Sequence, residues 1–201
     1  MIKDFDLLQR ANNDYTTIDL EHAEELAYRE LIDSIRYISL GDECGVMGNI
    51  ANIITYKGRF YIQEEQFDRV FIYDDTGRCL KKIDNKERGP GEYLRIESID
   101  INTEKEELML VDGMSDKLFF YDLDGNFKSI HSIRYFQTEN TLCLRDSVFL
   151  HISAPSQNFG NEGLYGYALV LSKGNENFLK GYRYLPLQVG YKGGGQIFKG
   201  Y

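Results

Sequence analysis

"RFYIQEEQFDRVFIYDDTGRCLKKI", residues 59–83, and "ELMLVDGMSDKLFFYDLDGNFKSIH", residues 107–131, are two copies of one pattern set 48 residues apart. Identical residue types recur in both copies at Asp68 and Asp116, Phe71 and Phe119, Tyr73 and Tyr121, Asp74 and Asp122, and Gly77 and Gly125. A weaker third copy follows over residues 147–182. Recurrence at a fixed period of this length indicates a repeat architecture.

Each copy holds four short segments rich in β-branched and aromatic residues, separated by turn residues, which predicts four antiparallel strands. In the first copy these strands are expected at Ile50–Thr55, Phe60–Gln63, Val70–Tyr73 and Cys79–Ile83. A β-sandwich would not require the same residues at one fixed offset, whereas a propeller blade does. The fold class predicted is therefore all-β, a β-propeller of four-stranded antiparallel blades.

The domain organisation follows from this repeat. We expect one domain over residues 1–201, with a lead-in at 1–34, an N-terminal strand, first blade and connector at 35–95, a second blade at 96–131, a third at 132–185 and a tail at 186–201. Leucines and alanines near a 3.6-residue period favour a short helix within 19–35, and "IRYISL", residues 35–40, alternates like a strand. The first fifteen residues have no apolar run, so neither a signal peptide nor a membrane span is predicted there.

The turns "YDDTGR" and "YDLDGN" close two hairpins of the repeat. An Asp opens each turn, and Gly77 or Gly125 is expected in the left-handed position that closes a bulged hairpin. Residues 122–125 also resemble the start of a calcium loop. Calcium is the weaker alternative because Thr76 stands in the twin turn where a ligand is needed, and no later Glu completes a cage.

Composition excludes some partners. The chain has 32 acidic and 23 basic residues and therefore a net charge of −9. Because its basic residues do not form a cluster, a nucleic-acid partner is disfavoured. Cys44, Cys79 and Cys143 lack metal-site spacing and are interpreted as buried free thiols, with one disulfide plus a spare thiol left open. His131 and His151 lie on expected strands, where a structural role is the simpler interpretation.

The segments "IRYISLGDE", "VFIYDDTGR" and "RGPGEY" together resemble a six-bladed β-propeller family of exported, lipoprotein-type proteins from anaerobic gut bacteria, with NHL-like architecture. The resemblance implies an exported, periplasmic or outer-membrane location. Six blades need roughly three hundred residues, so only part of such a ring is expected here. A closed four-bladed ring and two chains pairing as three plus three blades are the alternatives, and an open blade edge predicts self-association.

Segments that occur only once in the repeat can carry function, whereas residues that recur in each copy are expected to be structural. The recurring tyrosines, Tyr73 and Tyr121, are expected to pack with satisfied hydroxyls. The recurring aspartates, Asp68 and Asp116, are expected to fix the loop before the third strand of each blade. The unique segments are "ERGPGEYLR", residues 87–95, and residues 153–166. The candidate ligand-binding residues in them are Arg88, Glu92, Tyr93, Asn158, Asn161 and Tyr165. For Tyr93 the preferred role is to pack as a wedge between two blades. Gly89, Pro90 and Gly91 are expected to stiffen the connector. Glu92 is expected to accept backbone N–H groups or to pair with Arg88 or Arg95.

No catalytic motif is present, so the function predicted is a non-enzymatic binding or scaffold module for a small molecule, glycan or protein. No cofactor is expected. The alternative is a calcium-assisted hydrolase or lyase of the lactonase-like propeller type, with Glu64, Glu65, Glu92 and Asp112 as conceivable axial ligands. A purely structural interaction module is the third interpretation.

Overall fold

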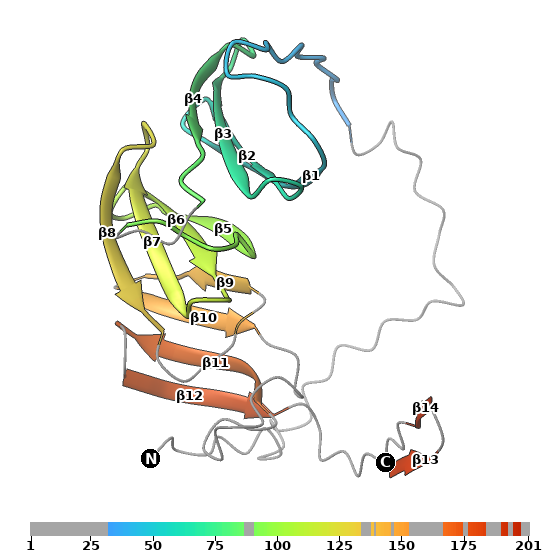
Figure 1. Ribbon diagram of the computed structural model, residues 1–201, viewed down its shortest axis with the longest axis vertical. Coiled ribbons are helices and arrows are strands. Elements are labelled where there is room, and N and C mark those ends of the chain that lie inside the picture. Colours follow the sequence, from blue (N-terminus) through green and yellow to red (C-terminus); the bar gives the residue numbers. More distant parts are fainter. Residues whose placement is uncertain are drawn as a thin grey trace.

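The computed structural model describes residues 32–86, 91–133, 138, 140–145, 147–152, 167–174, 177–183, 190–192 and 195–197. Within these ranges there are strands and irregular segments but no helix. Three four-stranded antiparallel sheets follow one another along the chain, each an open meander of consecutive strands, and a short hairpin comes last (Figure 1). The helix expected within 19–35 falls almost wholly outside the described residues.

The first sheet comprises β1 (Ile50–Tyr56), β2 (Arg59–Glu64), β3 (Arg69–Asp74) and β4 (Cys79–Ile83). Lys57 and Gly58 join β1 to β2 with φ angles of 48° and 71°, the pair of left-handed residues that a two-residue hairpin of matching twist requires. At the β3–β4 turn, Asp74 Oδ1 accepts the N–H groups of Thr76 and Arg78, and Gly77 has φ of 88°. The predicted strands and this bulged hairpin are confirmed.

The second and third sheets repeat this order. The second comprises β5 (Ser98–Asn102), β6 (Glu107–Asp112), β7 (Lys117–Asp122) and β8 (Phe127–Ser132). The third comprises β9 (Asn140–Cys143), β10 (Val148–Ile152), β11 (Tyr167–Lys173) and β12 (Asn177–Arg183), and the final hairpin joins β13 (Gly190–Lys192) to β14 (Gly195–Ile197). The β7–β8 turn has the same structure as the β3–β4 turn. Asp122 accepts the N–H groups of Asp124 and Asn126, and Gly125 has a φ of 79°.

The sheets stack face to face, and the first strands β1, β5 and β9 are neighbours in succession (Figure 1). We call the face of a sheet that packs on the following sheet its front face, and the opposite one its back face. The first junction buries Tyr61, Val70, Ile72 and Ile83 from the front of the first sheet against Ile99, Leu110, Phe119 and Tyr121 of the second. The second junction buries Met109, Val111, Leu118 and Phe120 against Phe149 and Val170 of the third sheet. Alternation along each strand supplies one apolar set for each face.

Tyr93 is the wedge that the sequence predicts. Its side chain is 0% exposed and its ring meets Phe119 edge-on, at 6.0 Å between centroids. The hydroxyl donates to the carbonyl of Asp68 at 2.8 Å and accepts the N–H of Asn85 at 3.1 Å. Gly91 has φ of 86°, as expected for the corner, while Gly89 and Pro90 lie outside the described residues. Tyr93 therefore joins the connector to both sheets.

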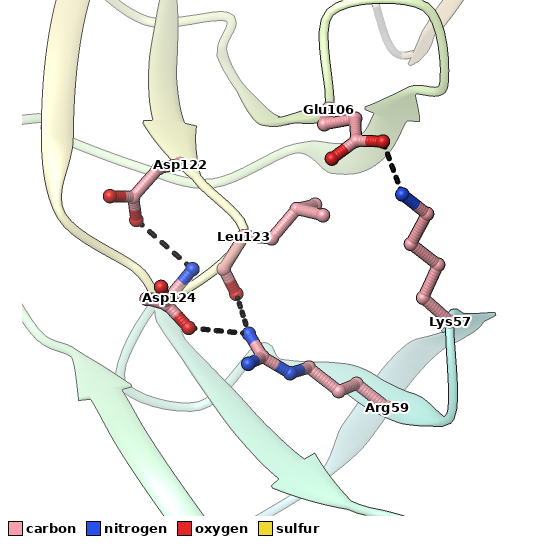
Figure 2. Close-up of a pocket in the computed structure, with 6 residues that line it drawn as sticks. All are labelled: Lys57, Arg59, Glu106, Asp122, Leu123 and Asp124. Atoms are coloured by element: carbon pink, nitrogen blue, oxygen red, sulfur yellow. Dashed lines mark hydrogen bonds and ion pairs between the residues drawn. The ribbon is translucent and has the colours of Figure 1, made fainter.

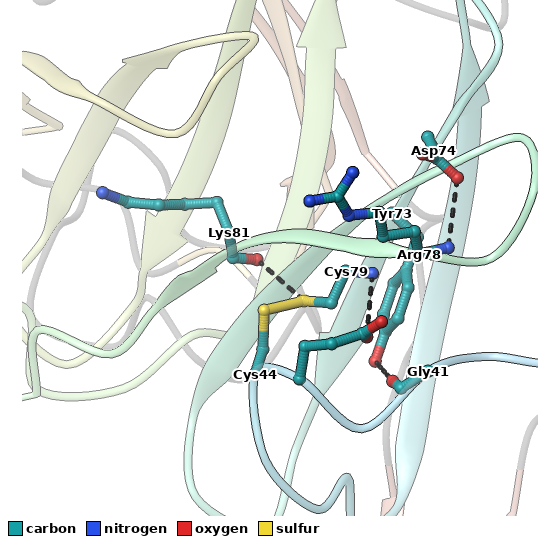
Figure 3. The surroundings of a disulfide bond; sticks show 8 residues. Gly41, Cys44, Tyr73, Asp74, Arg78, Cys79 and Lys81 are labelled. Atoms are coloured by element: carbon teal, nitrogen blue, oxygen red, sulfur yellow. Dashed lines mark hydrogen bonds between the residues drawn. A yellow bond between two sulfur atoms is a disulfide. The ribbon is translucent and has the colours of Figure 1, made fainter.

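The cysteine expectation is wrong for two of the three residues. Cys44 and Cys79 form a disulfide, with their Cα atoms 6.0 Å apart, and only Cys143 is free (Figure 3). The spacing of the cysteines in the sequence does not reveal this pairing, because residue 44 lies beside Cys79 of β4 only in the folded first sheet. The alternative of one disulfide and one spare thiol is the one observed.

The strand expected at residues 35–40 is also wrong. This segment is irregular and mostly exposed, with Tyr37 91% accessible. The Arg36 guanidinium donates to the carbonyl of Asp75, so the segment is tied to the β3–β4 turn by a side chain, and among the described strands it has no ladder partner. Alternation shows that a segment is suited to pairing, but a strand also needs a free edge beside it.

Candidate functional site

A polar hollow of about 440 Å³ lies between the first and second sheets, at the edge of the sheets where β1 turns into β2 (Figure 2). Its lining comes from three hairpin turns and the start of β2. The lining residues are Lys57, Arg59, Glu106, Asp122, Leu123 and Asp124. Turns gather here because the β1–β2, β5–β6 and β7–β8 hairpins all emerge at one end of the packed sheets.

Two ion pairs face each other across the hollow, each joining the first sheet to the second (Figure 2). Arg59 Nη1 pairs with Asp124 Oδ1 at 2.7 Å and donates to the carbonyl of Leu123 at 2.8 Å. The same carbonyl accepts the Tyr61 hydroxyl at 3.1 Å. Lys57 pairs with Glu106, and hydrogen bonding to that carboxylate raises the pKa of Lys57. The Asp124 carboxylate likewise raises the pKa of Arg59, so both cations stay charged.

Asp122 lies at the edge of the hollow, but its carboxylate serves its own turn. Oδ1 accepts the N–H groups of Asp124 and Asn126, and Oδ2 accepts the Asn126 side chain at 2.9 Å. Burial acts to raise the pKa of Asp122, but the hydrogen bonds from Asn126 and from the Asp124 N–H, together with the charge of Lys128, outweigh it, and the net shift is downward. Carboxylate oxygens used in this way cap a turn rather than face a cation. No group of three or more His, Cys, Asp or Glu in the described part of the chain is placed to hold a metal.

Two of the acids considered as axial ligands are also turn caps. Glu64 is fully buried and accepts the N–H groups of Gln66 and Phe67. Asp112 accepts the N–H groups of Met114 and Ser115 in the equivalent turn, and the N–H of Leu94 in the connector at 2.7 Å. These side chains hold the loop before the third strand of their sheets, a task that the sequence assigned to Asp68 and Asp116.

The recurring aspartates have a different role. Asp68 and Asp116 lie at the ends of those loops and adopt the left-handed backbone conformation, with φ angles of 55° and 54°. The Asp68 carboxylate reaches the connector, where Oδ1 accepts the N–H of Ile96 and Oδ2 pairs with Lys86. The recurring tyrosines also differ: the Tyr73 hydroxyl donates to the Gly41 carbonyl, whereas the buried Tyr121 hydroxyl lies beside the Asn85 side chain. Burial raises the pKa of Tyr121 to about 12, and the interaction with Asn85 opposes that shift.

His151 belongs to a buried network in the third sheet. It is 1% exposed, its Nδ1 lies 2.9 Å from Thr141 Oγ1, and its Nε2 lies 2.8 Å from Ser172 Oγ. Burial lowers the pKa of His151 to about 4. A neutral imidazole held between two hydroxyls inside the fold is structural, as the sequence predicts.

Of the six sequence-predicted site residues, the structure describes two, Glu92 and Tyr93. Arg88, Asn158, Asn161 and Tyr165 lie outside the described residues, Tyr93 is enclosed, and Glu92 is half-buried in the connector. Arg95, one of the three alternatives expected as partner of Glu92, forms an ion pair with Glu97 at 3.3 Å. Sequence reasoning does not find the hollow, because its residues occur in recurring turns, which the repeat identifies as scaffold. The usable signal was that the two copies differ there: Gly58 corresponds to Glu106, and Thr76 to Asp124.

Residues 15–192 match the model of the family described as "Domain of unknown function (DUF4934)". The chain belongs to this family. No curated protein matches the DUF4934 chain significantly. Within the described residues, no helix is long and apolar enough to cross a bilayer.

Among solved structures, the DUF4934 chain is similar to a protein from Bacteroides fragilis NCTC 9343 that has been assigned as exported. The two share 19% identity with a TM-score of 0.67 over 79% of this chain and 44% of that chain. The WD40 repeats of RRP9 (10% identity, TM-score 0.47, 68% of this chain and 39% of that one) and a DUF4221 family member from Bacteroides vulgatus (10%, 0.43, 73% and 48%) are more distant. The DUF4934 chain thus spans less than half the length of each.

Proposed function

We propose that the chain forms successive blades of a β-propeller that acts outside the cytoplasm as a non-enzymatic binding module. The stacked four-stranded sheets and the succession of β1, β5 and β9 support the propeller. The fold shared with the Bacteroides protein and the Cys44–Cys79 disulfide support an oxidising, extracytoplasmic location. The six-bladed, lipoprotein and cell-envelope features implied by the family resemblance belong to this proposal.

The observation that carries a binding role is the polar hollow, in which each of the two cations is already paired with a carboxylate. Its volume is in the range of small-ligand sites. By contrast, the buried acids Glu64 and Asp112 and the buried His151 are all engaged in structural hydrogen bonds. The described lining of the hollow offers hydrogen-bonding groups suited to recognition, and these three buried groups, which lie outside that lining, are occupied within the fold.

The ligand that fits this lining is neutral and rich in hydroxyl groups, such as a sugar residue. Three carboxylates against two cations leave the hollow with one net negative charge, which disfavours anions. A zwitterion would have to displace two ion pairs that already exist. Hydroxyls can instead accept from a cation and donate to its carboxylate partner without separating the pair.

Isothermal titration with glucose, galactose, N-acetylglucosamine and their disaccharides tests the proposal, with glucuronate and glycine as charged comparisons. We expect saturable binding of at least one neutral sugar, weakened about tenfold or more by Arg59→Ala, as for loss of a charged hydrogen-bond partner. Lys128→Ala is the matched control, because it breaks an ion pair with Glu107 that does not line the hollow. Absence of binding to every neutral sugar contradicts the ligand class, and calcium retained by the purified chain would favour the metal-assisted alternative.

A further inference from the structure

Two residues that line the hollow have a backbone conformation that is costly for a residue with a side chain. Lys57, in the β1–β2 turn, has a φ of 48°, and Glu106, at the end of the β5–β6 turn, has a φ of 54°. In the β3–β4 and β7–β8 turns the left-handed position is taken by glycine, at Gly77 and Gly125. Residues other than glycine that are held in this conformation cluster at functional sites.

Stability does not explain the choice of Lys57 and Glu106. Asp68, with a φ of 55°, shows the structural alternative, because its carboxylate accepts the N–H of Ile96 and pairs with Lys86 in the connector. The side chains of Lys57 and Glu106 instead pair with each other in solvent, where they are 53% and 52% exposed. An exposed ion pair of this kind contributes little to the free energy of unfolding.

The two ion pairs of the hollow differ in the hydrogen-bonding groups that they leave for a ligand (Figure 2). Arg59 Nη1 is shared between the Asp124 carboxylate and the Leu123 carbonyl. Lys57 has three N–H donors and Glu106 has two oxygens, and among the described residues their pair occupies one donor and one oxygen. Because both side chains line the hollow, the remaining donors and the second oxygen are available to a bound molecule.

Tyr56 holds the two turns in register. It directly precedes Lys57, and its hydroxyl donates to the carbonyl of Thr103, in the β5–β6 turn, at 3.3 Å. Its ring packs on the core of the first junction, and the ring centroid lies 5.6 Å from the Lys57 ammonium. Lys57 and Glu106 therefore meet at a defined place in the hollow.

We propose that Lys57 and Glu106 are the specificity-determining residues of the hollow: together they bind hydroxyl groups of a neutral sugar, and the Glu106 carboxylate excludes acidic sugars. The inference rests on the proposed function, because it takes the hollow as the binding site. A sugar hydroxyl can accept from the ammonium and donate to the carboxylate. A uronic acid carboxylate in the same place can only accept, so it meets the negative charge of Glu106, and this repulsion gives selectivity.

Reversing the charge at residue 106 tests the inference. The lining has three carboxylates and two cations, and Glu106→Lys changes this to two carboxylates and three cations, so its net charge goes from −1 to +1. Lys57 shows that a lysine is accommodated at nearly the same φ. In isothermal titrations, Glu106→Lys should bind glucuronate about tenfold or more tightly than wild type does. It should bind the neutral sugars, glucose, galactose and N-acetylglucosamine, correspondingly more weakly.

Three further variants separate the local effect from the general one. Glu104→Lys is the matched control, because it makes the same charge change at an exposed residue of the same turn that does not line the hollow, and it should leave both affinities unchanged. Glu106→Gln removes the charge alone and should give an intermediate affinity for glucuronate. Glu106→Gly relieves the left-handed backbone, so it should keep or raise the thermal midpoint while weakening neutral-sugar binding.

The inference is overturned if Glu106→Lys binds glucuronate no better than Glu104→Lys does, or if Glu106→Gly keeps the affinity of wild type for a neutral sugar. A lower thermal midpoint for Glu106→Gly also overturns it, because the side chain would then be held for stability. Failure of the proposed function has a different signature. If wild type binds no neutral sugar, that function fails, whereas a gain of glucuronate binding confined to residue 106 still supports the exclusion of anions by Glu106.

Discussion

The two junctions between sheets satisfy the carbonyl of the recurring aspartate with different hydrogen-bond donors. At the first, residues 84–97 connect the sheets, and the Asp68 carbonyl is reached by the hydroxyl of Tyr93. At the second, residues 133–139 connect them, and the corresponding carbonyl of Asp116 accepts the backbone N–H of Ile133 at 2.7 Å. The second connector is half as long as the first, and its own backbone N–H reaches the aspartate carbonyl. In the longer first connector, the side chain of Tyr93 spans the distance to that carbonyl.

The junctions also differ in how they treat charge. The Asp68 carboxylate is paired with Lys86 and accepts an N–H group. Asp116 has no such cation among the described residues, and burial together with repulsion from Asp112 raises its pKa. The second junction instead contains the neutral network of Thr141, His151 and Ser172. The repeat thus fixes backbone positions, whereas the stabilising groups are particular to each junction.

The sharpest way to break the first junction is Tyr93→Ala. Removing a fully buried aromatic ring that contacts both sheets should cost about 3–5 kcal/mol of unfolding free energy, measured by urea denaturation. Tyr93→Phe should cost only about 1 kcal/mol, since it loses the hydroxyl but keeps the ring. An unchanged midpoint for Tyr93→Ala would show that the connector is not what joins the sheets.

The second junction should respond to acid. His151 has a pKa of about 4 in the fold, below the 6.5 of an unperturbed imidazole, so the unfolded chain binds more protons between these values. Its contribution to stability is complete above pH 6.5 and is lost as pH falls toward 4, by on the order of 3 kcal/mol. His151→Gln should flatten this part of the stability–pH curve, whereas His131→Gln, at a less buried site, should change it little.

Replacing each recurring aspartate by asparagine compares the charges directly. Asp68→Asn removes the pairing with Lys86 and should destabilise by about 1 kcal/mol. Asp116→Asn relieves repulsion from Asp112 in a half-buried site, so it should be neutral or slightly stabilising at pH 7. Chemical denaturation of both variants on one buffer series measures the difference, and equal losses would remove the distinction between the junctions.

The smallest effect is expected at the turns. The Lys57–Glu106 pair bridges the first junction in solvent, with both side chains about half exposed. Lys57→Ala should therefore leave the thermal midpoint unchanged at both low and high salt. A clear, salt-sensitive drop would mean that the hollow's ion pairs help to hold the sheets together.

Sequence reasoning located the strands of the first sheet to within one residue, because aromatic and β-branched runs are bounded there by turns with a defined mechanism. Cys79–Ile83 was predicted with the observed bounds. Residues 35–40 failed because alternation is a property of the segment alone, whereas pairing depends on a neighbour. The sequence also could not show that three turns, from Lys57 to Asp124, converge on one hollow, since that follows from how the sheets stack.

The state of the third cysteine has a practical consequence. Cys143 is half-buried, and burial, with a contribution from Asp100, raises the pKa of its thiol to about 11. Because the thiolate is the reactive form, this residue should be slow to alkylate at neutral pH. With Cys44 and Cys79 joined, the oxidised protein then offers no fast-reacting sulfur. A cysteine placed at an exposed turn position such as Met114→Cys would be the preferred point for a fluorophore or spin label, without altering any native cysteine.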